Sequence, residues 1–227
     1  MSFLDRLRRR VKTVTRPRLA PTELRSGPRV RQVETGTEGA LRERLAADPN
    51  DAVSFAELAE IVRRHAAQGH GPGAPTNDTP EARARAADDA VWALAEELAR
   101  NPRAWLPLVE LARLSVAEDF DGAVRRLGIA SDRDPTGQAL LEGLLVLREA
   151  GLNDAALSLG TGHWRPAEHQ PAVGREMVLA ALAAGRLGEA KRHRAALLEH
   201  PDLAQTASLA ADLERQISKA KPSKTPS

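Results

Sequence analysis

The chain has 227 residues, a formal net charge of +2 and 42% hydrophobic residues, enough for a packed core in one large or two small domains. It contains no cysteine, which excludes disulfides, thiolate metal sites and a cysteine nucleophile. With three Phe, three Trp and no Tyr, the interior must be filled by Ala and Leu, and these residues favour closely packed helices.

The first predicted element is a basic amphipathic N-terminal arm over residues 1–36. Residues 1–33 hold ten Lys/Arg against two acidic residues, a net charge of +8. Since residues 216–227 add +3, residues 34–215 carry −9. Seven basic residues are the binding candidates of the arm, and they are Arg6, Arg8, Arg9, Arg10, Lys12, Arg16 and Arg18.

Several partners suit such an arm. Its apolar stripe, which includes Phe3, Leu7 and Val11, is typical of helices that lie on anionic membranes or dock in the groove of a protein. Its basic residues also suit the phosphates of RNA, although no aromatic residue alternates with them to stack on bases. In the remaining interpretation the stripe packs on the protein's own helices and the basic residues are solvated.

The rest of the chain has a regular spacing. Prolines stand where helical patterns end, and they are Pro49, Pro102, Pro135 and Pro201. Pro102 and Pro135 are 33 residues apart, and Pro135 and Pro201 are 66 apart. The longer interval before Pro102 contains a Gly/Pro-rich insert at 68–80. A period in this range is typical of stacked helical hairpins.

The apolar residues keep the same register in each period. First-helix positions read Phe55, Leu58, Ala59 and Val62, then Leu108, Leu111 and Ala112, and second-helix positions read Ala90, Leu94 and Pro102, then Ala123, Leu127 and Pro135. Over residues 37–215 this pattern resembles the tetratricopeptide repeat, a two-helix unit of about 34 residues. It departs from that family at Leu145 and Arg148, and the Gly-Tyr pair typical of the family is missing.

The resemblance implies an all-α, right-handed solenoid of antiparallel helix pairs, tetratricopeptide-like, behind the basic N-terminal arm. The predicted helical-repeat domain covers 37–218, with a flexible insert at 68–80 and a disordered tail at 219–227. The alternative is a non-repetitive helical bundle with prolines between its helices.

The resemblance also implies a groove, lined by the first helices of the pairs, that binds an extended peptide or a helix. The groove candidates are Glu60, Arg63, Arg64, Arg113, Glu142 and Glu149. Their mixed charges predict no sign for the ligand, and a solvated surface is the competing interpretation.

One segment, GTGHWRPAEH at 160–169, contains the zinc-ligating residue types His163, Glu168 and His169. It lies in a Gly/Pro-rich turn without helical His spacing, so we expect no metal there and expect Trp164 to anchor the turn over the core. Its Gly-x-Gly lacks the Lys-Ser/Thr of a phosphate loop. No acid–base pair or serine elbow stands out, and we predict no catalytic, cofactor-binding or metal residues.

The sequence therefore predicts a non-enzymatic scaffold or adaptor. Its groove would bind a protein partner, and its arm would make a second contact with protein, an anionic membrane surface or RNA. The alternative is an RNA- or ribosome-associated factor that binds through the arm. We expect a cytoplasmic location, with peripheral membrane attachment as a variant, because the longest apolar run is too short to cross a bilayer and the N-terminus lacks a signal-peptide core.

Overall fold

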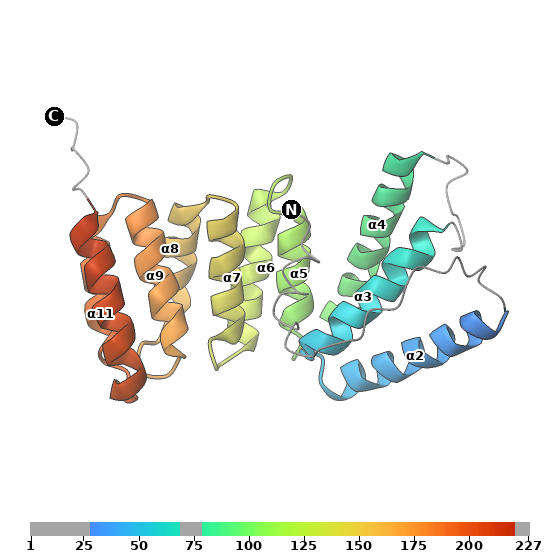
Figure 1. Cartoon of the computed structure of the whole chain (residues 1–227), viewed down its shortest axis with the longest axis horizontal. Helices are drawn as coiled ribbons and strands as arrows, with labels where there is room; N and C mark the ends of the chain where they lie inside the picture. The colour runs from blue at the N-terminus through green and yellow to red at the C-terminus, as the bar shows by residue number, and fades with distance from the viewer. Residues whose placement is uncertain (1–27, 69–78, 221–227) are drawn as a thin grey trace, which may run out of the picture. The chain divides into compact units, whose positions relative to one another are not determined.

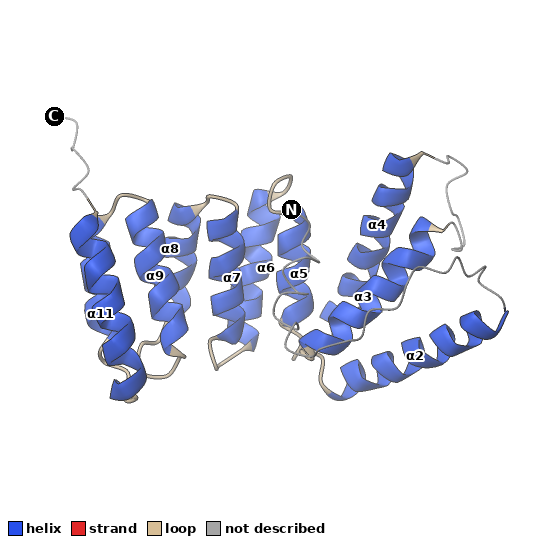
Figure 2. Ribbon diagram, in the orientation of Figure 1, coloured by secondary structure: helices blue, strands red, loops and turns tan. Residues whose placement is uncertain are grey.

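The computed structural model describes residues 28–68 and 79–220, and within them every regular element is a helix (Figure 2). The helices in chain order are α2 (Pro28–Ala47), α3 (Ala52–Ala67), α4 (Pro80–Ala99), α5 (Leu106–Ser115), α6 (Phe120–Arg133), α7 (Gln138–Glu149), α8 (Asn153–His163), α9 (Pro171–Ala183), α10 (Leu187–Leu197) and α11 (Leu203–Lys219). The predicted all-α class is confirmed for these residues. The seven basic candidates of the arm lie outside them, as do residues 69–78 of the insert.

The chain divides into two compact units, Met1–Ala90 and Val91–Ser227, with the boundary inside α4. In the first unit α2 packs against α3, and α2 begins at Pro28, within the range predicted for the arm. Phe55 and Leu58 are buried in α3, as the repeat register predicts. This helix begins at Asp51, whose side chain accepts hydrogen bonds from the backbone N–H groups of Val53 and Ser54.

The second unit is a succession of helices. Each helix from α5 to α11 packs against the next one along the chain, and α5, α7, α9 and α11 also pack against one another in that order. Figure 1 shows α5 to α9 and α11 side by side in chain order. Because each helix buries its apolar side mainly against its neighbours, this arrangement is compatible with a helical repeat.

The core of the second unit repeats small and large apolar residues at the expected spacing. Ala123, Ala156 and Ala190, 33 and 34 residues apart on α6, α8 and α10, are all fully buried. The predicted positions Leu127 and Leu144 are also fully buried. Alanine at the closest points of contact lets the backbones of packed helices approach each other.

Two turns of the second unit have the same hydrogen-bond pattern, 34 residues apart. After α7, Gly151 has φ 78° and donates to Arg148 O, and the next residue, Leu152, donates to Leu147 O. After α9, Gly185 has φ 73° and the corresponding bonds recur. Both are Schellman motifs, which need a left-handed residue that glycine adopts without strain. The repeat is therefore present in the backbone as well as in the core.

The turn predicted at Asp134-Pro135 is confirmed between α6 and α7. The Asp134 carboxylate is buried and accepts hydrogen bonds from the backbone N–H groups of Thr136, at 3.1 Å, and Ala139, at 2.7 Å. It therefore holds the start of α7, the helix that carries several charged residues of the candidate site.

Candidate functional site

Three of the six groove candidates come together on α5 and α7. Arg113 Nη2 lies 3.6 Å from Glu142 Oε2, and Arg113 Nη1 lies 3.6 Å from Glu149 Oε2. Glu142 and Glu149 are seven residues apart, two turns along one face of α7, and α5 packs against this helix. One guanidinium on α5 therefore faces two carboxylates of the neighbouring helix.

A third carboxylate, which the sequence analysis missed, completes this group. Glu110 is one turn before Arg113 on α5 and only 5% exposed, with its Oε2 3.7 Å from Arg113 Nε. Burial raises the pKa of Glu110 to about 7; Arg113 opposes this rise and Glu142 adds to it. We name Glu110, Arg113, Glu142 and Glu149 the Arg113 cluster.

A second group lies between α7 and α9 and was also missed. Glu176 on α9 is 2% exposed, and its two oxygens pair with different guanidiniums, those of Arg148 on α7 and Arg175 on α9. Arg148 is half-buried and Arg175 is exposed. We name Glu176, Arg148 and Arg175 the Glu176 cluster.

The repeat period relates the two clusters. Glu110 and Glu176 are 66 residues apart, two periods of 33, and Gly143 stands midway between them on α7. A search for buried charges at the repeat spacing would have found this relation in the sequence. In the described part of the chain the Arg113 cluster has one arginine for three glutamates, whereas the Glu176 cluster has two arginines for one glutamate.

The other three groove candidates, Glu60, Arg63 and Arg64, lie on α3 and belong to the first unit. Arg63 Nη1 forms an ion pair with Asp88 Oδ1 of α4 at 3.3 Å. Glu60 is half-buried and Arg64 is exposed. A partner-binding role for any of the six candidates stays a prediction.

The segment at 160–169 has a structural explanation. His163 Nε2 lies 3.3 Å from Asp132 Oδ1, whereas His169 is buried against Gly137, and burial lowers the pKa of its imidazole. Trp164 is half-buried, and a Cβ added at Gly174 would lie only 2.8 Å from its ring. Within residues 28–68 and 79–220, no three His, Cys, Asp or Glu side chains are grouped so that they could hold a metal ion.

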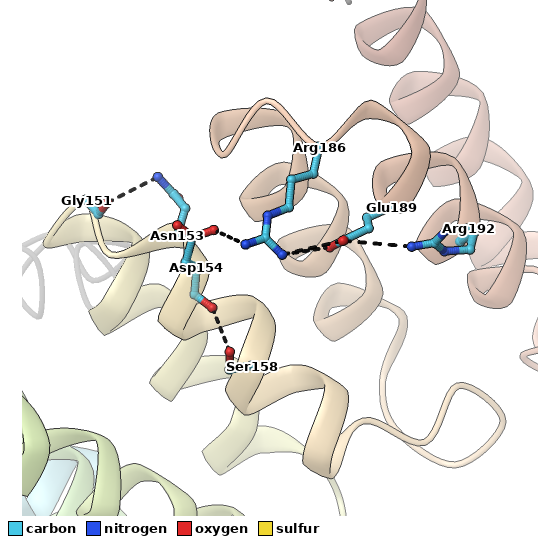
Figure 3. Close-up of polar contacts among 7 residues, drawn as sticks. All are labelled: Gly151, Asn153, Asp154, Ser158, Arg186, Glu189 and Arg192. Atoms are coloured by element: carbon cyan, nitrogen blue, oxygen red, sulfur yellow. Dashed lines mark hydrogen bonds and ion pairs between the residues drawn. The ribbon is translucent and has the colours of Figure 1, made fainter. Parts of the chain in front are cut away.

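Exposed ion pairs connect the two Schellman turns (Figure 3). Arg186, which follows Gly185, reaches Asp154 near the start of α8, with Nη2 2.7 Å from Oδ1. Glu189 on α10 pairs with Arg186 at 3.4 Å and with Arg192 at 3.8 Å. Because these side chains are largely exposed, each pair stabilises the fold by less than about 1 kcal/mol. The two buried clusters are thus the stronger candidates for a specific role.

No helix of the described ranges is both long and apolar enough to pass through a membrane. The chain matches no protein-family model, no curated protein and no solved structure. The helical succession of the second unit is therefore established by its own packing, and the tetratricopeptide assignment stays a prediction.

Proposed function

We propose that the protein is a non-catalytic interaction scaffold, built as a right-handed tetratricopeptide-like solenoid of antiparallel helix pairs. Three features of the second unit support this fold assignment: the spacing of its buried alanines, the two equivalent Schellman turns, and the packing of α5, α7, α9 and α11 on one another. Such arrays present the first helix of each pair on one continuous surface, and binding partners use that surface.

The observation that carries the proposal is the gathering of charged side chains on α5, α7 and α9. The Arg113 and Glu176 clusters lie at successive interfaces of this layer of helices, in a unit whose other contacts are mainly Ala and Leu. Glu149 and Arg175 are exposed members of the two clusters. Charged groups held on packed helices give an interface its partner selectivity, because a wrong partner leaves them desolvated and unpaired.

The basic arm supplies a second contact in this proposal. With its +8 charge, the arm would attract an acidic protein surface, an anionic membrane surface or RNA. We place the protein in the cytoplasm, with membrane attachment through the arm as a variant. If the arm binds RNA alone, the protein is instead an RNA- or ribosome-associated factor, and binding would weaken steeply with salt.

A charge-swap experiment tests the scaffold. Glu149→Arg with Arg175→Glu reverses one exposed charge in each cluster. Arg165→Glu with Glu168→Arg is the matched control, because it swaps an exposed ion pair in the α8–α9 turn with the same net charge. Proteins captured from lysate by the full chain are quantified, with and without nuclease. We expect one set of proteins to be retained by the wild type and the control and lost from the swapped variant, regardless of nuclease.

Two results would contradict the scaffold proposal. Equal capture by the swapped variant would show that this surface does not bind the captured proteins. Loss of the whole set after nuclease treatment would favour the RNA alternative.

A further inference from the structure

We propose that the Arg113 cluster is a receptor for a basic side chain, arginine or lysine, presented by a segment of a partner protein. This inference rests on the proposed scaffold function and adds the chemistry of its partner. It is carried by the charge of the cluster, by the burial of Glu110 and by the geometry of the carboxylates.

The first step is the sign of the cluster. The distances from the Arg113 guanidinium to its three carboxylates are 3.6, 3.6 and 3.7 Å, longer than the ~2.7–3.2 Å of a good N–H···O hydrogen bond. On α6, Arg126 is engaged with Asp119 at 3.3 Å and Ser115 at 3.1 Å, and it stacks on the Trp92 ring. Among the described residues, the cluster therefore has more carboxylates than cations, and its field attracts positive charge.

The second step is the state of Glu110. This carboxyl group is nine-tenths buried, and the cation beside it, Arg113, is outside hydrogen-bond distance. No hydrogen bond to it comes from the described part of the chain. Buried carboxylates normally accept hydrogen bonds, because the loss of water otherwise disfavours their charge. The raised pKa of Glu110 reflects this cost. A second cation nearby would stabilise the ionised form, so binding a cation and releasing a proton are linked.

The third step is the kind of cation. A divalent metal needs several oxygens at about 2.0–2.6 Å, but here Arg113 stands between the carboxylates, and they do not form a metal-binding group. Arg113 and Glu142 are both more than four-fifths buried as side chains. A charged group at the end of a long aliphatic stem reaches such a site, and this describes lysine and arginine.

The neighbouring Glu176 cluster sharpens the expected specificity. It presents two guanidiniums one interface further on, so a second basic residue placed there would be repelled. A segment with a basic residue over α5 and α7, and no positive charge over α7 and α9, fits both clusters. This arrangement would also set the direction in which the segment binds.

The test uses a labelled peptide with one central arginine and otherwise neutral residues, and the same peptide with citrulline, the neutral isostere. Binding to the full chain is measured by fluorescence anisotropy. The variant is Glu142→Gln with Glu149→Gln, and the matched control is Glu118→Gln with Glu168→Gln, two exposed glutamates outside the cluster. We expect the wild type and the control to prefer arginine over citrulline by about tenfold, as for one charge-assisted contact. The cluster variant should lose this preference.

Proton release gives an independent readout. Calorimetry at pH 7 in two buffers of different ionisation enthalpy should show release of part of a proton when the arginine peptide binds the wild type. Glu110→Gln should abolish this release, because the amide does not titrate. Thermal melts confirm that each variant is folded.

Equal affinity for citrulline and arginine, no binding of either peptide, or an unchanged preference in the cluster variant would each overturn the receptor. So would cluster-dependent binding of a glutamate version of the peptide. These results leave the scaffold proposal to the charge-swap capture experiment, whose outcome does not depend on the sign of the partner. The two failures are therefore distinguishable.

Discussion

The interfaces between α5 and α7 and between α7 and α9 place a buried glutamate at the same position of the repeat, yet they treat its charge differently. Glu176 is paired with two guanidiniums, whereas Glu110 shares one guanidinium with two other carboxylates. A buried ion pair stabilises a fold only when its Coulomb attraction repays the loss of hydration. The α7–α9 interface therefore reads as structural, and the α5–α7 interface as one held ready for an additional cation.

The largest expected effect comes from breaking the better-paired interface. Arg148→Met should lower the free energy of unfolding by about 3 kcal/mol, because it deprives the 2% exposed Glu176 of its partly buried partner. Arg175→Met, which removes a guanidinium that is 47% exposed, should cost less than about 1 kcal/mol. Urea unfolding of both variants measures the difference. Similar losses would show that the interhelical pair is not the principal contact of Glu176.

The next effect concerns pH and applies to Glu110 alone. Because burial raises the pKa of Glu110 from 4.5 to about 7, the folded state keeps a proton that the unfolded state releases between these values. The associated stability is present below about pH 4.5 and is lost as the pH rises through 7. Glu110→Gln, always neutral, should match the wild type near pH 5 and exceed it by about 2 kcal/mol near pH 8.

The matched variant for this pH test is Glu176→Gln. It should destabilise the protein at both pH values, because it weakens two charge-assisted contacts. Urea unfolding at the two pH values measures both variants. If Glu110→Gln had the same effect at pH 5 and pH 8, the carboxyl group would not titrate in this range, and the contrast between the interfaces would fail.

A smaller effect is expected at Gly160, where α8 packs against α9. A Cβ at this position would lie 1.9 Å from Met177 Sδ, so Gly160→Ala forces a fully buried side chain to move. The gain in helix propensity offsets part of this crowding, and a net loss of about 1 kcal/mol remains. Gly162→Ala on the same helix, with nothing within 4 Å of the added Cβ, is the control and should not destabilise. Thermal melts compare the two; equal stability would show that Met177 adapts freely.

Sequence reasoning was successful where a single period determines the outcome. The 33-residue spacing predicted buried positions such as Leu108, Leu127 and Leu144, and Asp134-Pro135 predicted the turn before α7. These features follow from local propensity and from the need of each helix to bury one side.

The candidate site was only half predicted, for a physical reason. Arg113, Glu142 and Glu149 followed from the family resemblance, but Glu110 and Glu176 stand among apolar residues, where sequence patterns lead one to expect core side chains. Their burial depends on guanidiniums that arrive from other turns or other helices, such as Arg148, which is 28 residues from Glu176. Such pairings depend on the register between packed helices, which the spacing of apolar residues constrains only loosely.

The smallest predicted effect concerns Gly143, which occupies on α7 the position that is glutamate on α5 and α9. A Cβ there would lie 3.2 Å from Leu159 Cδ2 and 3.4 Å from Leu127 Cδ2, a tight contact with the ends of two flexible side chains. Gly143→Ala should therefore change the free energy of unfolding by less than about 0.5 kcal/mol, since the gain in helix propensity of ~0.5–1 kcal/mol is offset by crowding. Gly143→Glu should cost more than 3 kcal/mol, because a carboxylate would be forced against two leucines with no guanidinium beside it. Urea unfolding of both variants distinguishes a position that tolerates only small residues from one that accepts a third buried glutamate. A mild effect of Gly143→Glu would mean that the alternation of glutamate and glycine along the repeat does not arise from packing.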